Sequence, residues 1–421
     1  MARIVLFELK KLLARRVALV ASLGVLAMLV GIMLLNVFQA RVVSFTGEVF
    51  SGPAAISYKR DEALARAGAI DVERVLSDVA SYREEAFAQV DPSEVSQLTN
   101  VAAYSLMLER YDAAYVERLY DPYWSWLLSP FHLSGEEPYQ TAARVTDDEL
   151  RDYYEAVASL TQTALDAGQG GTWEYGEAER AFWMDLEAQV PEPLAFGWAG
   201  GWSNVIDCVA FLVFPMLAAA ITLAPTFCAE YRSGADAVVL SARYGRSRLV
   251  GAKVAAALVY VVGYMVVSAA VIVGFSLAFY GADGFGLPVQ ALSLDCPYPI
   301  TAGQAALWSV GLMLACALGM CGLTLLLSSR MRSTLPVFVT DVVLLMVTGM
   351  LPSGGSGLIE HVLALFPLGF SNFSKLFGSL TSFVLGPVVL DLAGTVAVVW
   401  LLLSAATVPL AAHTFRHHQV A

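Results

Sequence analysis

The sequence lacks the motifs that would let it bind nucleotide or act as a self-contained enzyme. It has no GxxxxGK[ST] phosphate-binding loop, and the nearest stretch, residues 245–253, ends in Gly-Ala-Lys. HExxH and GxSxG motifs are absent, and no histidines cluster in the apolar runs. We therefore predict that the chain is not an enzyme and has no catalytic, cofactor or metal site of its own.

Cysteine is also scarce, and its placement excludes a disulfide framework. The five cysteines are Cys208, Cys228, Cys296, Cys316 and Cys321. None lies in the polar region 41–201, and none shows CxxC or Cys/His metal spacing. Because four of them lie in or beside apolar segments, we expect buried small hydrophobic side chains.

Composition and charge define the broad class. Hydrophobic residues make up 57% of the chain and the mean hydropathy is +0.63, whereas a soluble domain has about 45–50% apolar residues. The net charge is −12, yet residues 41–200 hold 28 acidic and 11 basic side chains, so the remainder carries +5. This predicts a polytopic membrane protein with an acidic water-facing domain on one side and a basic cytoplasmic face on the other.

Apolar runs predict six transmembrane helices. The first, Val17–Phe38, follows a basic start that holds the N-terminus in the cytoplasm, and residues 3–13 form an interfacial amphipathic helix. Five more runs follow, at Ser203–Phe227, Ala255–Tyr280, Gly303–Leu327, Thr334–Leu351 and Phe383–Ala411. Lysine and arginine then lie on one side, with both termini cytoplasmic. The short apolar stretch within Leu358–Leu376 contains Pro367 and Gly369, which favours a re-entrant or interfacial segment.

Three regions follow from these spans. Residues 1–40 hold the N-terminal helix and first span, and 202–421 hold five further spans with a cytoplasmic loop at 228–253. Between them, residues 41–201 are predicted to form a helical extracytoplasmic domain, with helices within 60–88, 93–119, 147–167 and 174–189. Its aromatic groups (Tyr120, Tyr123, Trp124, Trp126, Trp198 and Trp202) are interpreted as membrane-interface anchors, with a ligand surface as the alternative. The fold class is thus an all-α polytopic membrane protein.

The loop from Phe227 to Lys253 is a charged island between two apolar runs. Ser233 stands three residues before Asp236, a capping-box spacing, and Gly245 offers a helix stop. Between them Ala235, Val238, Val239 and Ala242 fall at i, i+3, i+4 and i+7 and make one apolar stripe. After Gly245, Ser247 is expected to cap the next helix. The stripe needs a partner surface, unless the segment is an ordinary surface helix in a positively charged loop.

The island resembles the first cytoplasmic loop of ABC-2 type transporter permeases. The residues that carry the resemblance are Glu230, Tyr231, Arg232, Gly234, Leu240-Ser241, Tyr244-Gly245-Arg246 and Lys253. The resemblance implies a coupling helix that docks on a separate ATPase chain, which binds ATP and Mg²⁺. It assigns the coupling role to these residues: Glu230, Arg232, Gly234, Ala235, Val238, Val239, Ala242 and Gly245. It also implies a second permease, identical or related, in a bacterial plasma membrane.

The function that follows is that of the permease subunit of an ATP-binding cassette exporter. It would move a substrate outward, and a peptide, lipid, drug or ion remains open as that substrate. The alternative is a non-transporting complex in which ATPase motion works the extracytoplasmic domain as a sensor or mechanical transmitter.

Two further sets of residues in the spans are candidates. Gly311, Ala315 and Gly319 recur every four residues and predict a helix-packing face, within the bundle or between two permeases. Asp341 and Asp391 are the intramembrane carboxylates. Such groups usually face protein or water, so we expect for Asp341 either a buried structural hydrogen bond or a substrate contact, and for Asp391 an interfacial position.

Overall fold

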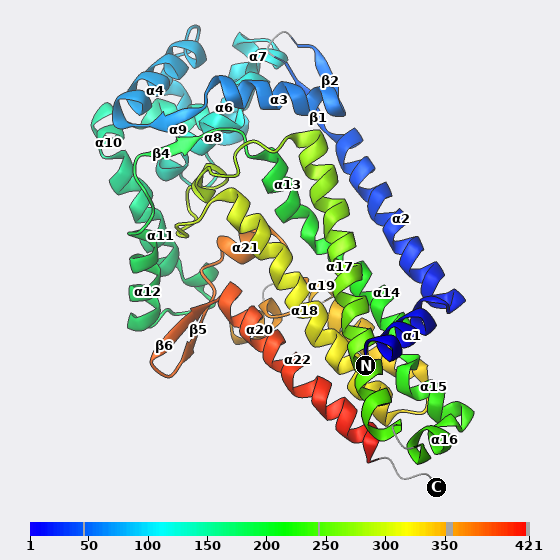
Figure 1. The fold of residues 1–421 in the computed structure, drawn as a ribbon. Coiled ribbons are helices and arrows are strands. Elements are labelled where there is room, and N and C mark those ends of the chain that lie inside the picture. Colours follow the sequence, from blue (N-terminus) through cyan, green and yellow to red (C-terminus); the bar gives the residue numbers. More distant parts are fainter. Residues whose placement is uncertain (45–46, 243–244, 351–356, 418–421) are drawn as a thin grey trace. The chain divides into compact units, whose positions relative to one another are not determined.

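The computed structural model describes residues 1–44, 47–242, 245–350 and 357–417, and the chain in it is mostly helical (Figure 1). The side chains of residues 169, 170, 236, 239, 240, 246, 348 and 350 lie outside this description. The chain forms two compact units. Unit 1 comprises Met1–Met33, Asn204–Ser276 and Ala306–Ala421, and unit 2 comprises Leu34–Ser203 and Leu277–Ala305.

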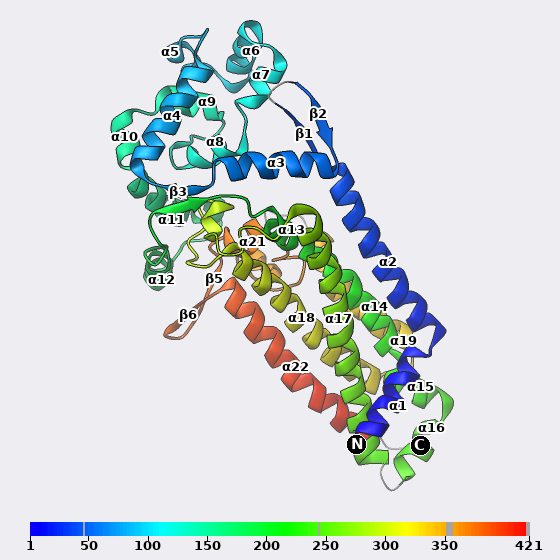
Figure 2. The same cartoon turned by 45° about the horizontal axis from the view of Figure 1, so that its top comes forward.

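Unit 1 is built on long apolar helices. In the described part of the chain, five helical segments are long and apolar enough to cross a membrane: Arg16–Gln39, Gly200–Ser233, Ser247–Tyr280, Ala302–Arg330 and Leu392–Arg416. The protein is therefore a multi-pass membrane protein. Its helices α17 (Val250–Tyr280), α18 (Ala302–Arg330) and α22 (Leu392–Arg416) run side by side in both views (Figure 1 and Figure 2).

The other elements of unit 1 are shorter or complete these segments. They are α1 (Ala2–Leu13), α2 (Arg16–Gln39, which continues into unit 2), α13 (Gly200–Cys208, which begins in unit 2), η2 (Val209–Leu212), α14 (Val213–Leu223), α15 (Pro225–Ser233), α16 (Ala235–Ser241), the π-helical turn η3 (Gly245–Leu249), α19 (Thr334–Met350), α20 (Gly357–Ala364) and α21 (Phe373–Phe377). A hairpin of β5 (Ser382–Leu385) and β6 (Val388–Asp391) precedes α22, pairing Ser382 with Asp391.

The predicted start of the last span at Phe383 is wrong. Residues 382–391 form the β5–β6 hairpin, and α22 begins only at Leu392. The turn holds Gly386 at φ +64°, followed by Pro387, between runs of β-branched residues. A Gly-Pro pair in that setting favours a hairpin, because glycine adopts the positive φ without steric cost.

Two other predicted segments are shorter than a span. Helix α19 has 17 residues, and its predicted end, Leu351, lies outside the described residues. At about 1.5 Å per residue, 17 residues cover about 25 Å, less than the hydrocarbon core. The region 358–376 contains α20 and α21 with a break between them, so neither helix crosses a bilayer by itself. Its re-entrant character stays a prediction.

Unit 2 consists of short, well-capped helices with two small antiparallel sheets. Its elements are β1 (Arg41–Val43), β2 (Val49–Ser51), α3 (Pro53–Ala65), β3 (Gly68–Ile70), α4 (Val72–Ala86), α5 (Pro92–Val95), α6 (Asn100–Arg110), α7 (Ala113–Arg118), α8 (Pro122–Leu127), η1 (Ser129–Phe131), α9 (Pro138–Arg144), α10 (Asp147–Arg151), α11 (Tyr153–Gly171), α12 (Glu177–Glu187), β4 (Leu194–Phe196) and η4 (Val289–Ala291). Strand β1 pairs with β2, and β3 pairs with the distant β4. Three of the four predicted helices are divided by proline, glycine or aspartate caps, whereas the one predicted within 174–189 is a single helix, α12.

The aromatic residues of unit 2 form its core, so the prediction that they anchor the protein in a membrane interface is wrong for the main cluster. Tyr123, Trp124 and Trp126 are all buried in one cluster with residues from α4, α6 and α9. Helices α4 and α9 also pack against each other. The indole of Trp126 donates a hydrogen bond to the carbonyl of Gln290 (2.7 Å), and Leu294 joins the same core. The loop 281–302 thus belongs to unit 2, which the sequence did not indicate.

Candidate functional site at the loop from Pro225 to Lys253

The charged island begins with α15, whose start is fixed by α18. The hydroxyl of Ser328 accepts hydrogen bonds from the backbone amides of Phe227 (3.0 Å) and Cys228 (3.2 Å). It also donates one to the carbonyl of Ala224 (2.7 Å). Amides in the first turn of a helix lack intrahelical partners, so this serine acts as a cap supplied by another helix. One turn later Tyr231 donates to the carbonyl of Ser329 (2.8 Å).

Glu230 lies at the centre of a buried cluster of charges. Lys253, at the start of α17, donates from Nζ to Glu230 Oε1 (2.8 Å) and to Glu8 Oε2 (3.3 Å). Lys11 donates to the same Glu230 oxygen (3.1 Å). Only 3% of the Lys253 side chain and 10% of the Glu230 side chain are exposed. The cluster therefore ties α1, α15 and α17 together through charged hydrogen bonds that water screens little.

A small cavity borders this cluster. Glu8, Lys11, Leu12, Arg15, Thr226 and Lys253 line a space of about 10 Å³. Among the described residues, the Arg15 Nη1 and Thr226 Oγ1 atoms are buried without a hydrogen-bond partner. A space of this size holds one water molecule.

Gly234 turns the chain between α15 and α16. Its φ of +68° lies in the left-handed region, which suits glycine at the end of a helix. The expected capping role of Ser233 is wrong: this residue ends α15, and its hydroxyl donates back to the carbonyls of Ala229 and Glu230. Helix α16 starts after Gly234 without a side-chain cap.

Helix α16 is shorter than predicted. It ends at Ser241, with Ala242 already extended, so Gly245 is not its stop. Gly245 instead opens the π-helical turn η3, and Ser247 lies inside that turn and does not cap α17. Residues 243 and 244, which the longer helix would have included, lie outside the described residues. The predicted end of α16 and the predicted start of α17 are wrong because the π-helical turn η3 leads directly into α17.

The apolar stripe on α16 faces outward in this chain. Val238 is 72% exposed, Ala242 is exposed and Ala235 is partly exposed. The side chain of Val239 lies outside the described part of the structure. Of the other predicted coupling residues, Arg232 is exposed, whereas Gly245 and Glu230 are buried. The structure thus separates the set into an outward group that a partner could contact and an inward group that holds the loop in place.

The small residues of α18 differ in what they contact within this chain. A Cβ at Gly319 would lie 2.5 Å from a ring carbon of Trp400 in α22, so this glycine allows two helices of the same chain to touch. Ala315 is buried, but a Cβ at Gly311 would meet no atom within 4 Å. Gly319 therefore packs within the bundle, while Gly311 faces an open space.

The two predicted intramembrane carboxylates have different surroundings. Asp341 is fully buried, and its Oδ2 accepts a hydrogen bond from Thr324 of α18 (2.9 Å). Its Oδ1 has no partner among the described residues. Asp391 is instead the N-cap of α22, where its Oδ1 accepts from the amide of Gly394 (2.9 Å). Asp391 is thus a helix cap at the end of the span, and only Asp341 lies in the bundle interior.

The residues that hold the loop from outside it were not predicted from the sequence. Glu8 and Lys11 come from α1, Ser328 comes from α18, and the ring of Phe415 in α22 lies 4.6 Å from that of Phe227. One signal was present: Glu8 is the only acidic residue in the first 47. The others gave no signal, because ordinary serine and phenylalanine residues acquire their roles through contacts about 100 or more residues away.

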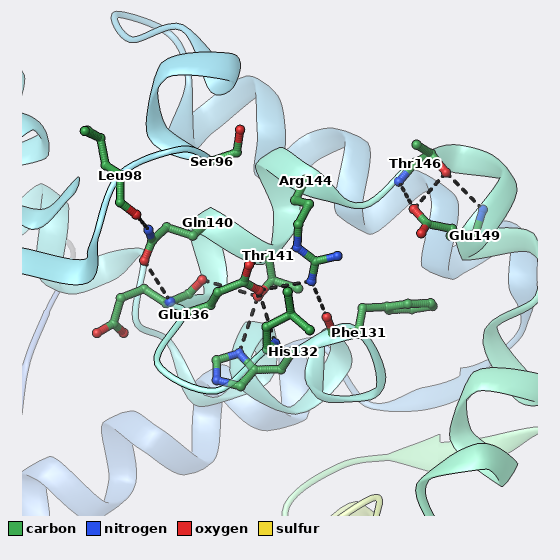
Figure 3. A network of polar contacts seen from close by, with 12 residues as sticks. Ser96, Leu98, Phe131, His132, Glu136, Gln140, Thr141, Arg144, Thr146 and Glu149 are labelled. Carbon is green, nitrogen blue, oxygen red and sulfur yellow. Dashed lines mark hydrogen bonds and ion pairs between the residues drawn. The ribbon is translucent and has the colours of Figure 1, made fainter. Parts of the chain in front are cut away.

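Unit 2 holds a second polar network, which Figure 3 shows. Arg144 donates to both carboxylate oxygens of Glu136, from Nε (2.9 Å) and from Nη2 (3.0 Å). The buried Thr141 hydroxyl also contacts Glu136 (3.1 Å) and lies 3.3 Å from His132 Nδ1. Burial raises the pKa of Glu136, but the bonds from Arg144, Leu133 and Thr141 lower it more, and the pKa lies below its usual value. The network braces the loop before α9 and presents no activated nucleophile.

All five cysteines are free and buried, as predicted. In the described residues, no group of three or more His, Cys, Asp or Glu side chains could hold a metal ion. Comparison with known proteins finds no matching family model, no similar curated protein and no similar solved structure.

Proposed function

We propose that this chain is the permease subunit of an ABC-2 type exporter, driven by a separate ATPase chain that binds ATP and Mg²⁺. The observation that carries the proposal is the loop itself, an outward apolar residue on a short helix whose base is held by charges from three elements. An exposed valine on a short helix, next to a helix that buried ion pairs hold in place, is suited to docking on a partner.

The supporting cluster gives a mechanical reason for this proposal. Force applied to α16 passes through Gly234 into α15, and from Glu230 into Lys253 of α17 and into α1. Because these contacts are buried and charged, moving α15 alone would separate ions in a medium that screens them poorly. A push on the loop is therefore expected to move the ends of the three helices together.

The proposal includes a topology. Helix α19 serves as a sixth, short span beside the five longer ones, and both termini lie in the cytoplasm of a bacterium with residues 41–201 outside its plasma membrane. The permease acts as a pair with a second copy or a relative. The substrate, whether a peptide, a lipid or a drug-like molecule, leaves the cell as ATP binding closes the ATPases.

Val238→Glu tests the docking step. Burying an unpaired carboxylate costs several kcal/mol, whereas a solvated surface change alters stability by no more than about 0.5 kcal/mol. We expect the variant to reach the membrane in normal amount but to lose co-purification with a P-loop ATPase. Val238→Leu, which keeps an apolar side chain at the same position, is the control and should retain the ATPase. If no P-loop ATPase accompanies the unaltered protein, or if both variants bind it equally, the proposal fails.

Thiol labelling tests the topology. Ser134 and Ser247 are both exposed, so a cysteine at either position is accessible from its own side of the membrane. In a background with the five native cysteines replaced, an impermeant reagent on intact cells should label Ser134→Cys and leave Ser247→Cys unlabelled. Labelling at both positions, or only at Ser247→Cys, contradicts the proposed orientation.

The continuity of helix α17 favours a second candidate function. Helix α17 carries Lys253 in its first turn, in unit 1, and continues to Tyr280, which belongs to unit 2. There the Tyr280 hydroxyl donates to Asn36 Oδ1 (2.7 Å). The second candidate is a non-transporting complex in which ATPase motion works unit 2 as a sensor or mechanical transmitter. Purified protein in vesicles with its ATPase separates the two, because only an exporter accumulates or expels a solute.

A further inference from the structure

Helices α18 and α22 border an open apolar groove of about 520 Å³. Both helices are among the five long enough to cross a membrane, and the volume lies in the usual range for small-molecule sites. The groove is lined by Leu307, Trp308, Gly311, Leu312, Leu314, Ala315 and Leu318 from α18, and by Asp391, Ala393, Gly394, Ala397 and Leu401 from the start of α22. Almost all of these side chains are hydrocarbon or aromatic, so the groove suits a long apolar ligand.

The groove exists because the same two helices separate after a tight contact. At Gly319 a Cβ would lie 2.5 Å from Trp400, and at Gly322 it would lie 2.1 Å from the hydroxyl of Thr407. At Gly311, two turns from Gly319, it would meet nothing within 4 Å. The two helices are therefore apart at Gly311, where the groove lies, and in close contact at Gly319 and Gly322.

One end of the groove is polar and acidic. Among its lining residues, all of them described, Asp391 alone has an ionisable side chain. It is partly exposed, and it lies where the chain changes from the β5–β6 hairpin to a membrane-length helix. That hairpin exposes Val384, Leu385 and Val388, each by slightly more than half. An acidic group next to exposed apolar residues, at the end of a membrane-length helix, is typical of a position at the boundary between bilayer and water.

We propose that this groove binds the acyl chain of an amine-bearing membrane lipid, whose ammonium headgroup contacts the carboxylate of Asp391. The apolar walls pack against the acyl chain by van der Waals contact, and the carboxylate pairs with the ammonium through a charge-assisted hydrogen bond. A lipid with an anionic headgroup would place like charges together and bind less well. The inference does not rest on the proposed transport function.

The test uses the full chain in mild detergent, with phosphatidylethanolamine and phosphatidylglycerol as the two lipid probes. Native mass spectrometry counts lipids retained at increasing lipid concentration. We expect phosphatidylethanolamine to be retained about tenfold more tightly, a ratio that one charge-assisted contact can supply. Asp391→Asn should abolish this preference while keeping the helix cap, because asparagine caps helices as well as aspartate does.

A filled groove provides the second arm. Gly311→Leu places a side chain in open space and should lower retention of both lipids about tenfold. Gly263→Leu is the matched control, since Gly263 is also exposed on a span with no atom within 4 Å of its Cβ position. It should bind lipid like the unaltered chain. Equal retention by the two leucine variants, or an unchanged headgroup preference in Asp391→Asn, overturns the proposal. Loss of a dimer in Gly311→Leu with normal lipid retention also overturns it, because the groove would then hold a second copy.

Discussion

The two units of this protein place polar and apolar side chains in opposite ways. Unit 2 buries Tyr82 and Trp183 and keeps acidic groups such as Asp148 in water. Unit 1 buries Lys253 and Asp341, while apolar residues such as Leu402 cover its surface. Each unit follows the same rule, that a polar group needs water or a polar partner, in a different solvent. In lipid the only partners for charged groups are inside the protein.

The ends of helices differ in the same way. In unit 2, aspartates cap several short helices: Asp71, Asp91, Asp112 and Asp121 each accept a bond from a backbone amide two or three residues on. In unit 1 the start of α15 is capped by Ser328 from another helix, and Asp391 of α22 is a local cap of the unit 2 kind. Local caps can be read from sequence, whereas caps supplied by another helix cannot.

The largest expected effect of a substitution is in the buried charge cluster. Lys253→Met removes the cation that pairs with both Glu8 and Glu230. Breaking a buried pair costs about 3–5 kcal/mol, because Glu8 loses its cation while Lys11 still pairs with Glu230. We expect much less folded protein in detergent on heating, measured by size-exclusion chromatography. Arg151→Met, which removes an exposed pair with Asp148 in unit 2, should cost less than about 1 kcal/mol. Similar losses in the two variants would contradict a stabilising role for the buried cluster.

A smaller effect is expected for a hydrogen bond in the core of unit 2. Tyr82 is fully buried and its hydroxyl donates to the carbonyl of Leu119 (2.6 Å). Tyr82→Phe keeps the ring but leaves that carbonyl without its donor, which costs about 1–3 kcal/mol. Thermal unfolding followed by circular dichroism should show a lower midpoint. Tyr104→Phe, at a position that is 41% exposed, should leave the midpoint unchanged. A drop of the same size in both variants would contradict a specific role for the Tyr82 hydroxyl.

The smallest effect is a pH dependence confined to unit 2. Because the folded pKa of Glu136 lies below its ordinary value of 4.5, its ionised form stabilises the fold above that value. This contribution is lost as pH falls through the folded pKa. Glu136→Gln should therefore lower stability slightly at pH 7 and flatten its decline in acid. Unfolding midpoints measured between pH 7 and pH 3 check this, and parallel profiles for the variant and the parent would refute it.

The sequence predicted the class of each unit because composition and charge report on the solvent. Long apolar runs required a membrane, and the excess of acidic residues in 41–200 required water. Three of the five membrane-length segments began within three residues of their predicted starts, whereas the segment predicted from Ala255 began eight residues earlier, at Ser247. The prediction for the last one failed at its start, because apolar strands of a hairpin and the first turns of an apolar span have the same composition. Only the Gly386-Pro387 pair marked the difference.

A coupling role for the loop at 227–253 was predicted from its local sequence pattern. The structure adds that Val238, part of that pattern, is exposed. Only the tertiary structure brought Glu8, Lys11 and Lys253 to Glu230, moved Tyr123 and Trp126 from an expected membrane interface into a core, and added residues 277–305 to unit 2. The physical reason is that solvent preference is a property of each segment, whereas partner choice depends on which segments the folded backbone brings within about 3 Å of each other. A sequence states the first directly and leaves the second to the fold.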